Sequence, residues 1–287
     1  SNFTYRFIDP ELERSVAQQF GVTSYPAIIF ENLVDQTLQE TQTFTEDSFI
    51  TSILIVTGTK QKVVYYLTGH GEAASTRDLM TGIVGDPTDG FDFAIQGLQR
   101  DNYQVLPLNL KQTGQVPENA ATLVIAGPTD PIDLEEQQAL SNYAKQGGTL
   151  VGLFDPNTHR TFAEFFAQWG ILIGGNTIAD VVSNVAGQEL TPLLQKSNGQ
   201  YFTSTSQITQ GIPIADQIEV SFFPDATALE PLIPVEEMPP YIQIIPLAMT
   251  TPASWLEKDP ENVNFSPEED RSGPFTIAAV VRASGTI

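Results

Sequence analysis

The chain has 287 residues, of which 41% are hydrophobic, and its 13 Lys and Arg against 35 Asp and Glu give a formal net charge of −22. So acidic a surface repels phosphate backbones and anionic lipid headgroups, which disfavours nucleic-acid binding and docking on anionic membranes. The sequence contains no cysteine and only two histidines, His70 and His159. Thiol nucleophiles, disulfides, thiolate zinc sites and multi-histidine metal sites are therefore excluded.

Residues 1–58 predict a small unit of helices and strands. In order, the chain predicts a strand, a helix, two strands and a closing helix, at residues 5–8, 9–20, 22–30, 39–44 and 46–54. Asp9 is a common helix N-cap and Pro10 fits a first helical turn. The order strand, helix, Gly-Val, proline and strand resembles the second half of a thioredoxin fold. We therefore expect a partial thioredoxin-like βαββα unit with a cis peptide bond before Pro26.

Residues 59–287 predict a second α/β domain, in which strands and helices first alternate with short loops. Strands are expected at residues 63–67, 103–108, 122–126 and 149–154 and from residue 171, and helices at 91–102, between 133 and 147, and around 162–169. This alternation predicts a doubly wound, flavodoxin-like parallel sheet with right-handed crossovers. In the last helix, aromatic side chains recur at i, i+3, i+4 and i+7, which is typical of a core-facing stripe: Phe162, Phe165, Phe166 and Trp169.

From about residue 176 the pattern is less regular and predicts a β-rich elaboration that also completes the sheet. Residues 187–205 are polar and rich in turn formers. Strands are expected at residues 217–223, 241–249 and 274–282, with a proline-rich stretch at 229–240 and an acidic loop at 257–273 between them.

The candidate site follows the strand at residues 63–67, whose continuous apolar run suits a strand buried on both faces. The strand stops at Thr68-Gly69-His70-Gly71-Glu72, and Asp130 and Asp155 follow two other strands. Because ligands gather at the carboxyl ends of parallel strands, we expect a ligand or partner contact site of His70, Glu72, Asp130 and Asp155. The alternative is that Glu72 and Asp130 cap helices or turns while His70 bonds a neighbouring loop.

Motifs for known chemistry are missing from the sequence. It contains no Walker A motif, no GxGxxG fingerprint and no GxSxG elbow. A metal site of His70 with carboxylates is a weaker possibility, because one histidine among scattered aspartates is poor evidence. We therefore expect no catalytic residue, no metal and no cofactor. The competing hypothesis is a hydrolase or saccharide-binding enzyme that uses the loop around His70 and Glu72.

Several segments, taken in order, resemble the GldG-like auxiliary proteins of ABC-type transport systems, which are associated with gliding motility. The main one is residues 63–72, ending Leu-Thr-Gly-His-Gly-Glu; the others are residues 8–10, 54–57, 123–128, 143–150, 248–255 and 270–274. The resemblance implies an extracytoplasmic domain beside ABC permease and ATPase subunits, anchored in the membrane by segments outside this sequence. It also implies a core similar to class I glutamine amidotransferases and to a domain of intraflagellar transport proteins. The nucleophilic cysteine of the amidotransferases has no counterpart in this chain.

Overall fold

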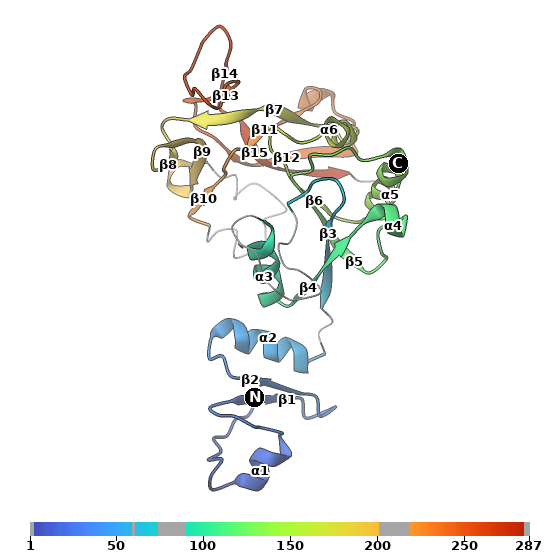
Figure 1. Cartoon of the computed structure of the whole chain (residues 1–287), viewed down its shortest axis with the longest axis vertical. Helices are drawn as coiled ribbons and strands as arrows, with labels where there is room; N and C mark the ends of the chain where they lie inside the picture. The colour runs from blue at the N-terminus through green and yellow to red at the C-terminus, as the bar shows by residue number, and fades with distance from the viewer. Residues whose placement is uncertain (1–2, 59–60, 74–89, 201–217, 284–287) are drawn as a thin grey trace. The chain divides into compact units, whose positions relative to one another are not determined.

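The computed structural model of the protein describes residues 3–58, 61–73, 90–200 and 218–283 (Figure 1). Its architecture is mixed α/β, with a four-stranded parallel sheet and additional antiparallel sheets. The chain divides into two compact units. The first comprises residues 1–65, 75–106 and 119–121, and the second comprises residues 66–74, 107–118 and 122–287.

The N-terminal part of the first unit is a hairpin covered by a helix (Figure 1). Its elements are α1 (Arg14–Gln19), β1 (Ile28–Glu31), β2 (Leu38–Thr41) and α2 (Glu46–Val56). The strands pair antiparallel, with Ile28 opposite Thr41. Thr45 begins α2 through a capping box with Ser48, which satisfies backbone N–H groups at the start of the helix. Phe30 of β1 meets Phe49 of α2 edge-to-face with ring centroids 5.8 Å apart, so aromatic packing joins helix and hairpin.

Two predictions for this part are wrong. Residues 5–8 are irregular, because they form no strand ladder with another described segment. The first helix begins at Arg14 and not at Asp9, since the Asp9 carboxylate accepts hydrogen bonds from the N–H groups of Glu11 and Leu12 and closes a turn there. The peptide bond before Pro26 is cis, as predicted. The thioredoxin likeness and the boundary at residue 58 stay predictions.

The four predicted strands of the central region are confirmed and form one sheet. In the order β4-β3-β5-β6, they are Tyr103–Leu108, Lys62–Leu67, Ala120–Ala126 and Leu150–Leu153. The helices between and after them are α3 (Asp92–Arg100), α4 (Leu110–Thr113), α5 (Leu134–Lys145) and α6 (Arg160–Ala167). Every residue of β3 from Val63 onward is buried, which confirms the strand inferred from its unbroken apolar run. Most of the loop expected before α3 lies outside the described residues.

The aromatic stripe of α6 belongs to the core, as predicted. Phe162 and Phe165 have no exposed surface. Phe166 packs edge-to-face against both Phe165 and Phe154 of the chain segment that follows β6, with ring centroids 5.2 and 4.8 Å apart. The stripe thus holds α6 against the segment that follows the sheet's edge strand.

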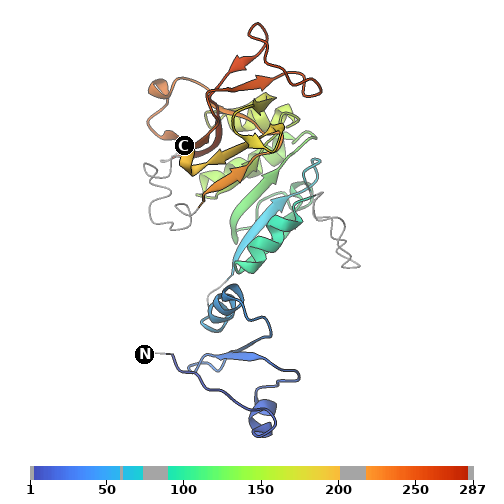
Figure 2. The same cartoon turned by 90° about the vertical axis from the view of Figure 1, so that its left-hand side faces the viewer.

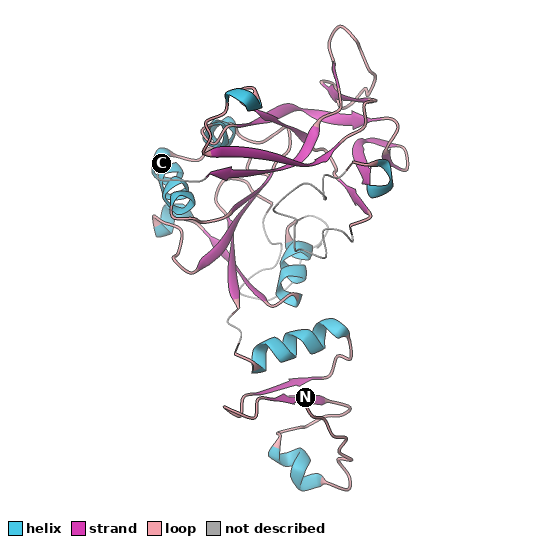
Figure 3. Ribbon diagram, turned by 180° about the vertical axis from the view of Figure 1, so that it is seen from behind, coloured by secondary structure: helices cyan, strands magenta, loops and turns pink. Residues whose placement is uncertain are grey.

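The rest of the second unit is built mainly from strands (Figure 3). They are β7 (Ile171–Asp180), β8 (Asn184–Val185), β9 (Gln188–Gln195), β10 (Val220–Phe222), β11 (Thr227–Pro231), β12 (Ile242–Met249), β13 (Ser254–Glu257), β14 (Arg271–Ser272) and β15 (Thr276–Ala283). Short 3₁₀ helices lie at η2 (Lys196–Asn198) and η4 (Val235–Glu237). Figure 2 shows the hairpin of β13 and β14 in red.

These strands form sheets of their own, ordered β10-β9-β8, β11-β7-β13-β14 and β12-β15. The expectation that they complete the parallel sheet is therefore wrong for the described residues, because their described pairings are all antiparallel. The turn-rich stretch expected at residues 187–205 instead contains β9, whose Leu194 is fully buried among Ile178, Ala228 and Ala248. Burial in this second core overrides the polar local composition. Residues 201–205 lie outside the described chain.

Because the α6 stripe is buried, removing one of its rings should lower the free energy of unfolding. Phe165→Ala should lower the free energy of unfolding by about 3–5 kcal/mol, because the cavity adds to the lost burial of the ring. Phe93→Ala removes the same ring from a position that is 60% exposed, so it serves as the matched control. Urea unfolding of both variants measures the difference; equal, small losses would contradict burial of Phe165.

Candidate functional site

The candidate site begins where β3 ends, in the loop of residues 68–73. Gly69 and Gly71 have φ values of +114° and +71°, a backbone region that side chains other than glycine rarely adopt. A Cβ at Gly71 would also collide with the hydroxyl of Thr129. The loop ends where Ala73 N–H donates to Ala126 O at 2.8 Å. The two glycines therefore allow a tight loop that folds back onto the end of β5.

This turn places His70 between two carboxylates. The ring nitrogen Nδ1 lies 2.9 Å from Glu72 Oε1, and Nε2 lies 3.0 and 3.1 Å from the two carboxylate oxygens of Glu136. The His70 backbone N–H also donates to Glu72 Oε2 at 2.7 Å. His70 is only 1% exposed, and both glutamates are buried as well. Both ring nitrogens thus face acceptors, which is the arrangement that suits an imidazolium with a proton on each nitrogen.

Charge and burial shift the pKa values of His70 and Glu72 in opposite directions. Burial tends to lower the pKa of His70, but the hydrogen bonds and charges of Glu72 and Glu136 raise it above its ordinary value. Burial tends to raise the pKa of Glu72, but hydrogen bonds from His70 hold it below its ordinary value. The two shifts both favour the charged forms of His70 and Glu72, which are those of an ion pair.

The cluster joins separate parts of the second unit. Glu136 is the third residue of α5, and its carboxylate also accepts the Asp133 N–H in a capping box. The backbone oxygen of His70 accepts hydrogen bonds from the N–H groups of Thr129 and Asp130. The His70 ring lies edge-to-face on Phe162 of α6, 5.5 Å between centroids. His70 thus ties the β3 loop to the β5 loop through its backbone oxygen and to α5 and α6 through its ring.

The structure brings His70 and Glu72 together and places the predicted aspartates nearby but outside the cluster. Asp130 is exposed, with a carboxylate oxygen 3.5 Å from where a Cβ on Gly71 would lie. Asp155 is half-buried near Gly127 and accepts a hydrogen bond from Asn157 N–H at 2.7 Å. Asp155 thus closes a local turn. A ligand or partner role for the four residues stays a prediction.

Sequence reasoning missed Glu136 as a member of the site. Its signal in the sequence is the spacing of Asp133 and Glu136, which is that of a capping box at the start of a helix. The other histidine, His159, caps α6, because its ring accepts a hydrogen bond from Thr161 N–H. Among the described residues, no group of three or more His, Asp or Glu side chains is arranged to hold a metal ion.

Comparison with known proteins identifies the family. A family model described as an ABC-type uncharacterized transport system matches residues 61–286. The chain belongs to this family of auxiliary proteins of ABC-type transport systems. The resemblance seen in the sequence is thereby confirmed at the level of the ABC transport auxiliary family.

Two further comparisons concern this auxiliary protein. No curated protein matches it. Among solved structures, the mmIFT52 N-terminal domain is similar, with 14% sequence identity and a TM-score of 0.47 over 67% of this chain and 74% of that one. In the described part of the auxiliary protein, none of the helices has the length and apolar character needed to cross a membrane.

The buried cluster makes the stability of the auxiliary protein depend on pH. A raised His70 pKa stabilises the fold fully below the unfolded value, 6.5, and this stabilisation is lost as pH rises through the folded pKa. A lowered Glu72 pKa stabilises the fold above its unfolded value of 4.5, and this is lost as pH falls through the folded pKa. Urea unfolding across the pH range should therefore show a maximum between these two losses.

His70→Gln tests this assignment. The variant leaves Glu72 and Glu136 buried without their cation, which should cost about 3–5 kcal/mol at neutral pH. It should also flatten the fall in stability on the alkaline side. His159→Gln is the matched control, because it changes the other histidine, which is half-buried. An unchanged alkaline slope in His70→Gln would show that another group titrates.

The loop geometry gives a second test, at Gly71. Gly187 also has a positive φ, +83°, but a Cβ there would meet nothing within 4 Å. Gly187→Ala should therefore cost about 1–2 kcal/mol from backbone strain alone. Gly71→Ala adds a collision with Thr129 and should cost more, and Thr129→Ala in the same chain should restore part of the loss. Equal melting temperatures for the two glycine variants would contradict the close approach of these loops.

Proposed function

We propose that the chain is a non-enzymatic binding or scaffold domain of an ABC-type transport system, of the GldG-like, gliding-motility-related kind. In this proposal it works on the extracytoplasmic side, anchored by segments outside this sequence, and contacts the permease and ATPase subunits. The observation that carries the proposal is the family match over residues 61–286. The signature that ends at Glu72 supports the finer GldG-like assignment.

The state of the candidate site supports a non-enzymatic role. Each ring nitrogen of His70 already faces a glutamate, and all three side chains are at least nine-tenths buried. A general acid or base must reach a substrate proton within hydrogen-bonding distance. The hydrolase or saccharide-binding alternative, which needs His70 and Glu72 free to act, has less support from this arrangement.

The finer fold assignments belong to the same proposal. The strand order β4-β3-β5-β6 corresponds to 2-1-3-4 in chain order within the sheet, which is the beginning of the flavodoxin-like order. It supports a flavodoxin-like, catalytically empty amidotransferase-like domain. The succession α1, β1, β2, α2 supports a partial thioredoxin-like unit before it.

Affinity purification tests the proposed partners. The full-length protein, purified from detergent-solubilised membranes of its host, should bring ABC permease and ATPase subunits with it, identified by mass spectrometry. If the edge of the sheet contacts them, Asp130→Asn with Asp155→Asn should reduce their recovery. Glu236→Gln with Glu237→Gln is the matched control, because it removes two exposed charges from η4. Recovery of neither subunit with the unaltered protein would contradict the proposal.

A further inference from the structure

The first unit exposes aromatic side chains that a folded core would bury. Between residues 3 and 25, four of the five aromatic side chains are exposed: Phe3, Tyr5, Phe7 and Tyr25 are 64%, 78%, 91% and 63% exposed. No residue described in that stretch is buried. Tyr5 and Phe7 lie edge-to-face with ring centroids 5.9 Å apart, so the exposed rings include a contiguous pair. Such patches mark interaction surfaces more often than isolated exposed residues do.

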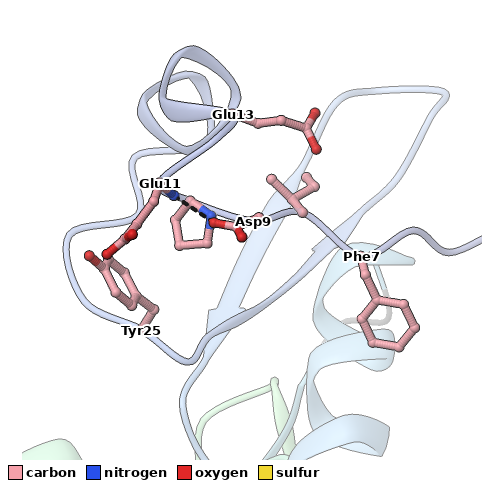
Figure 4. A pocket seen from close by; sticks show the side chains of 7 residues that line it. Phe7, Asp9, Glu11, Glu13 and Tyr25 are labelled. Atoms are coloured by element: carbon pink, nitrogen blue, oxygen red, sulfur yellow. Dashed lines mark hydrogen bonds between the residues drawn. The ribbon is translucent and has the colours of Figure 1, made fainter.

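Phe7 of this pair also lines an open pocket with acidic side chains; Figure 4 shows Glu11 beside Tyr25 and the Phe7 ring pointing away from both. We call it the acidic aromatic groove; it is lined by Phe7, Ile8, Asp9, Pro10, Glu11, Glu13 and Tyr25. The Asp9 carboxylate is occupied by the N–H groups of the turn. The carboxylates of Glu11 and Glu13 form no ion pair with Arg6, Arg14 or any other cation in the part of the chain that the structure describes.

The negative charge of the groove indicates which class of partner can bind there. Three carboxylates beside apolar rings favour a cation with apolar neighbours, and Lys or Arg can also lie on the face of Phe or Tyr. A second copy of this chain would bring another charge of −22 to the contact, which opposes association. An anionic lipid surface is repelled for the same reason. A basic, apolar segment of another protein satisfies both the charge and the exposed rings.

We propose that the acidic aromatic groove binds an extended, basic segment of a protein partner. Lys or Arg side chains of that segment pair with Glu11 and Glu13, while its apolar side chains pack on Phe7 and Tyr25. The proposal goes beyond the transport role and does not depend on it, because it rests on the first unit alone. The recovery of transporter subunits in the affinity purification therefore does not test this proposal.

A peptide titration tests the proposal directly. The probe is a short fluorescein-labelled peptide in which Lys alternates with Leu, and binding is followed by fluorescence anisotropy. Two companion peptides replace every Lys by Glu or every Leu by Ser. The Lys–Leu peptide should bind most tightly, and Phe7→Ala with Tyr25→Ala should raise its Kd about tenfold or more, as loss of aromatic anchors usually does. Glu11→Gln with Glu13→Gln should also weaken it and reduce its salt dependence.

Matched variants separate the groove from the general acidity of the chain. Phe93→Ala with Phe222→Ala removes two rings that are 60% and 62% exposed elsewhere, and Glu236→Gln with Glu237→Gln removes two exposed charges. Both should leave the Kd unchanged. Equal weakening by groove and control variants would overturn the proposal, because the peptide would then be held by net charge alone.

Three further outcomes would assign the groove to another occupant and overturn the proposal. Concentration-dependent dimerisation in analytical ultracentrifugation that Phe7→Ala abolishes would indicate a second copy. Co-sedimentation with phosphatidylglycerol vesicles that the same variant abolishes would indicate a lipid surface. Binding of the peptide by this chain but not by the protein as isolated from cells would indicate a segment of the same polypeptide.

Discussion

The buried ion pair around His70 is the constraint on which the centre of the second unit depends. A buried charge is tolerated only where partners replace the lost water, and here each ring nitrogen has a glutamate. The requirement fixes several features at once. Glycine at positions 69 and 71 allows the loop to turn, and α5 must begin where Glu136 reaches the ring. Removing the His70 ring would leave two buried carboxylates without a cation, and removing either glutamate would leave a buried ring nitrogen without its acceptor.

The same constraint bears on function. In parallel α/β sheets, ligands usually bind beyond the carboxyl ends of the strands. In this protein the end of β3 is closed by its own loop, whose histidine is bonded on both sides and buried against Phe162. The exposed carboxylate of Asp130 lies beside this loop. Both nitrogens of the His70 ring are therefore engaged within the protein at this edge.

Local sequence patterns predicted the parallel sheet because its signals are strong and agree with each other. Unbroken apolar runs predicted β3 and β5, and the aromatic stripe at residues 162–169 predicted the buried face of α6. The failures occur where a distant partner decides the outcome. β9 is polar in composition but is held by neighbouring strands and a buried Leu194. His70 and Glu72 were identified from a glycine-bounded loop, whereas Glu136 was missed because it lies in the first turn of α5 and not directly after a strand.

The first unit presents the opposite situation to the His70 cluster. Its hairpin has only two strands, and a two-stranded hairpin is marginally stable unless something covers it. One face receives α2 through Phe30 and Phe49, yet the segment before β1 leaves its rings in solvent. Covering exposed aromatic rings removes apolar surface from water, which is favourable. A partner that covers these rings would therefore gain hydrophobic free energy and would also pack against the irregular residues 3–13. The exposed rings of the first unit thus favour a partner, whereas the His70 cluster of the second unit is satisfied by its own side chains.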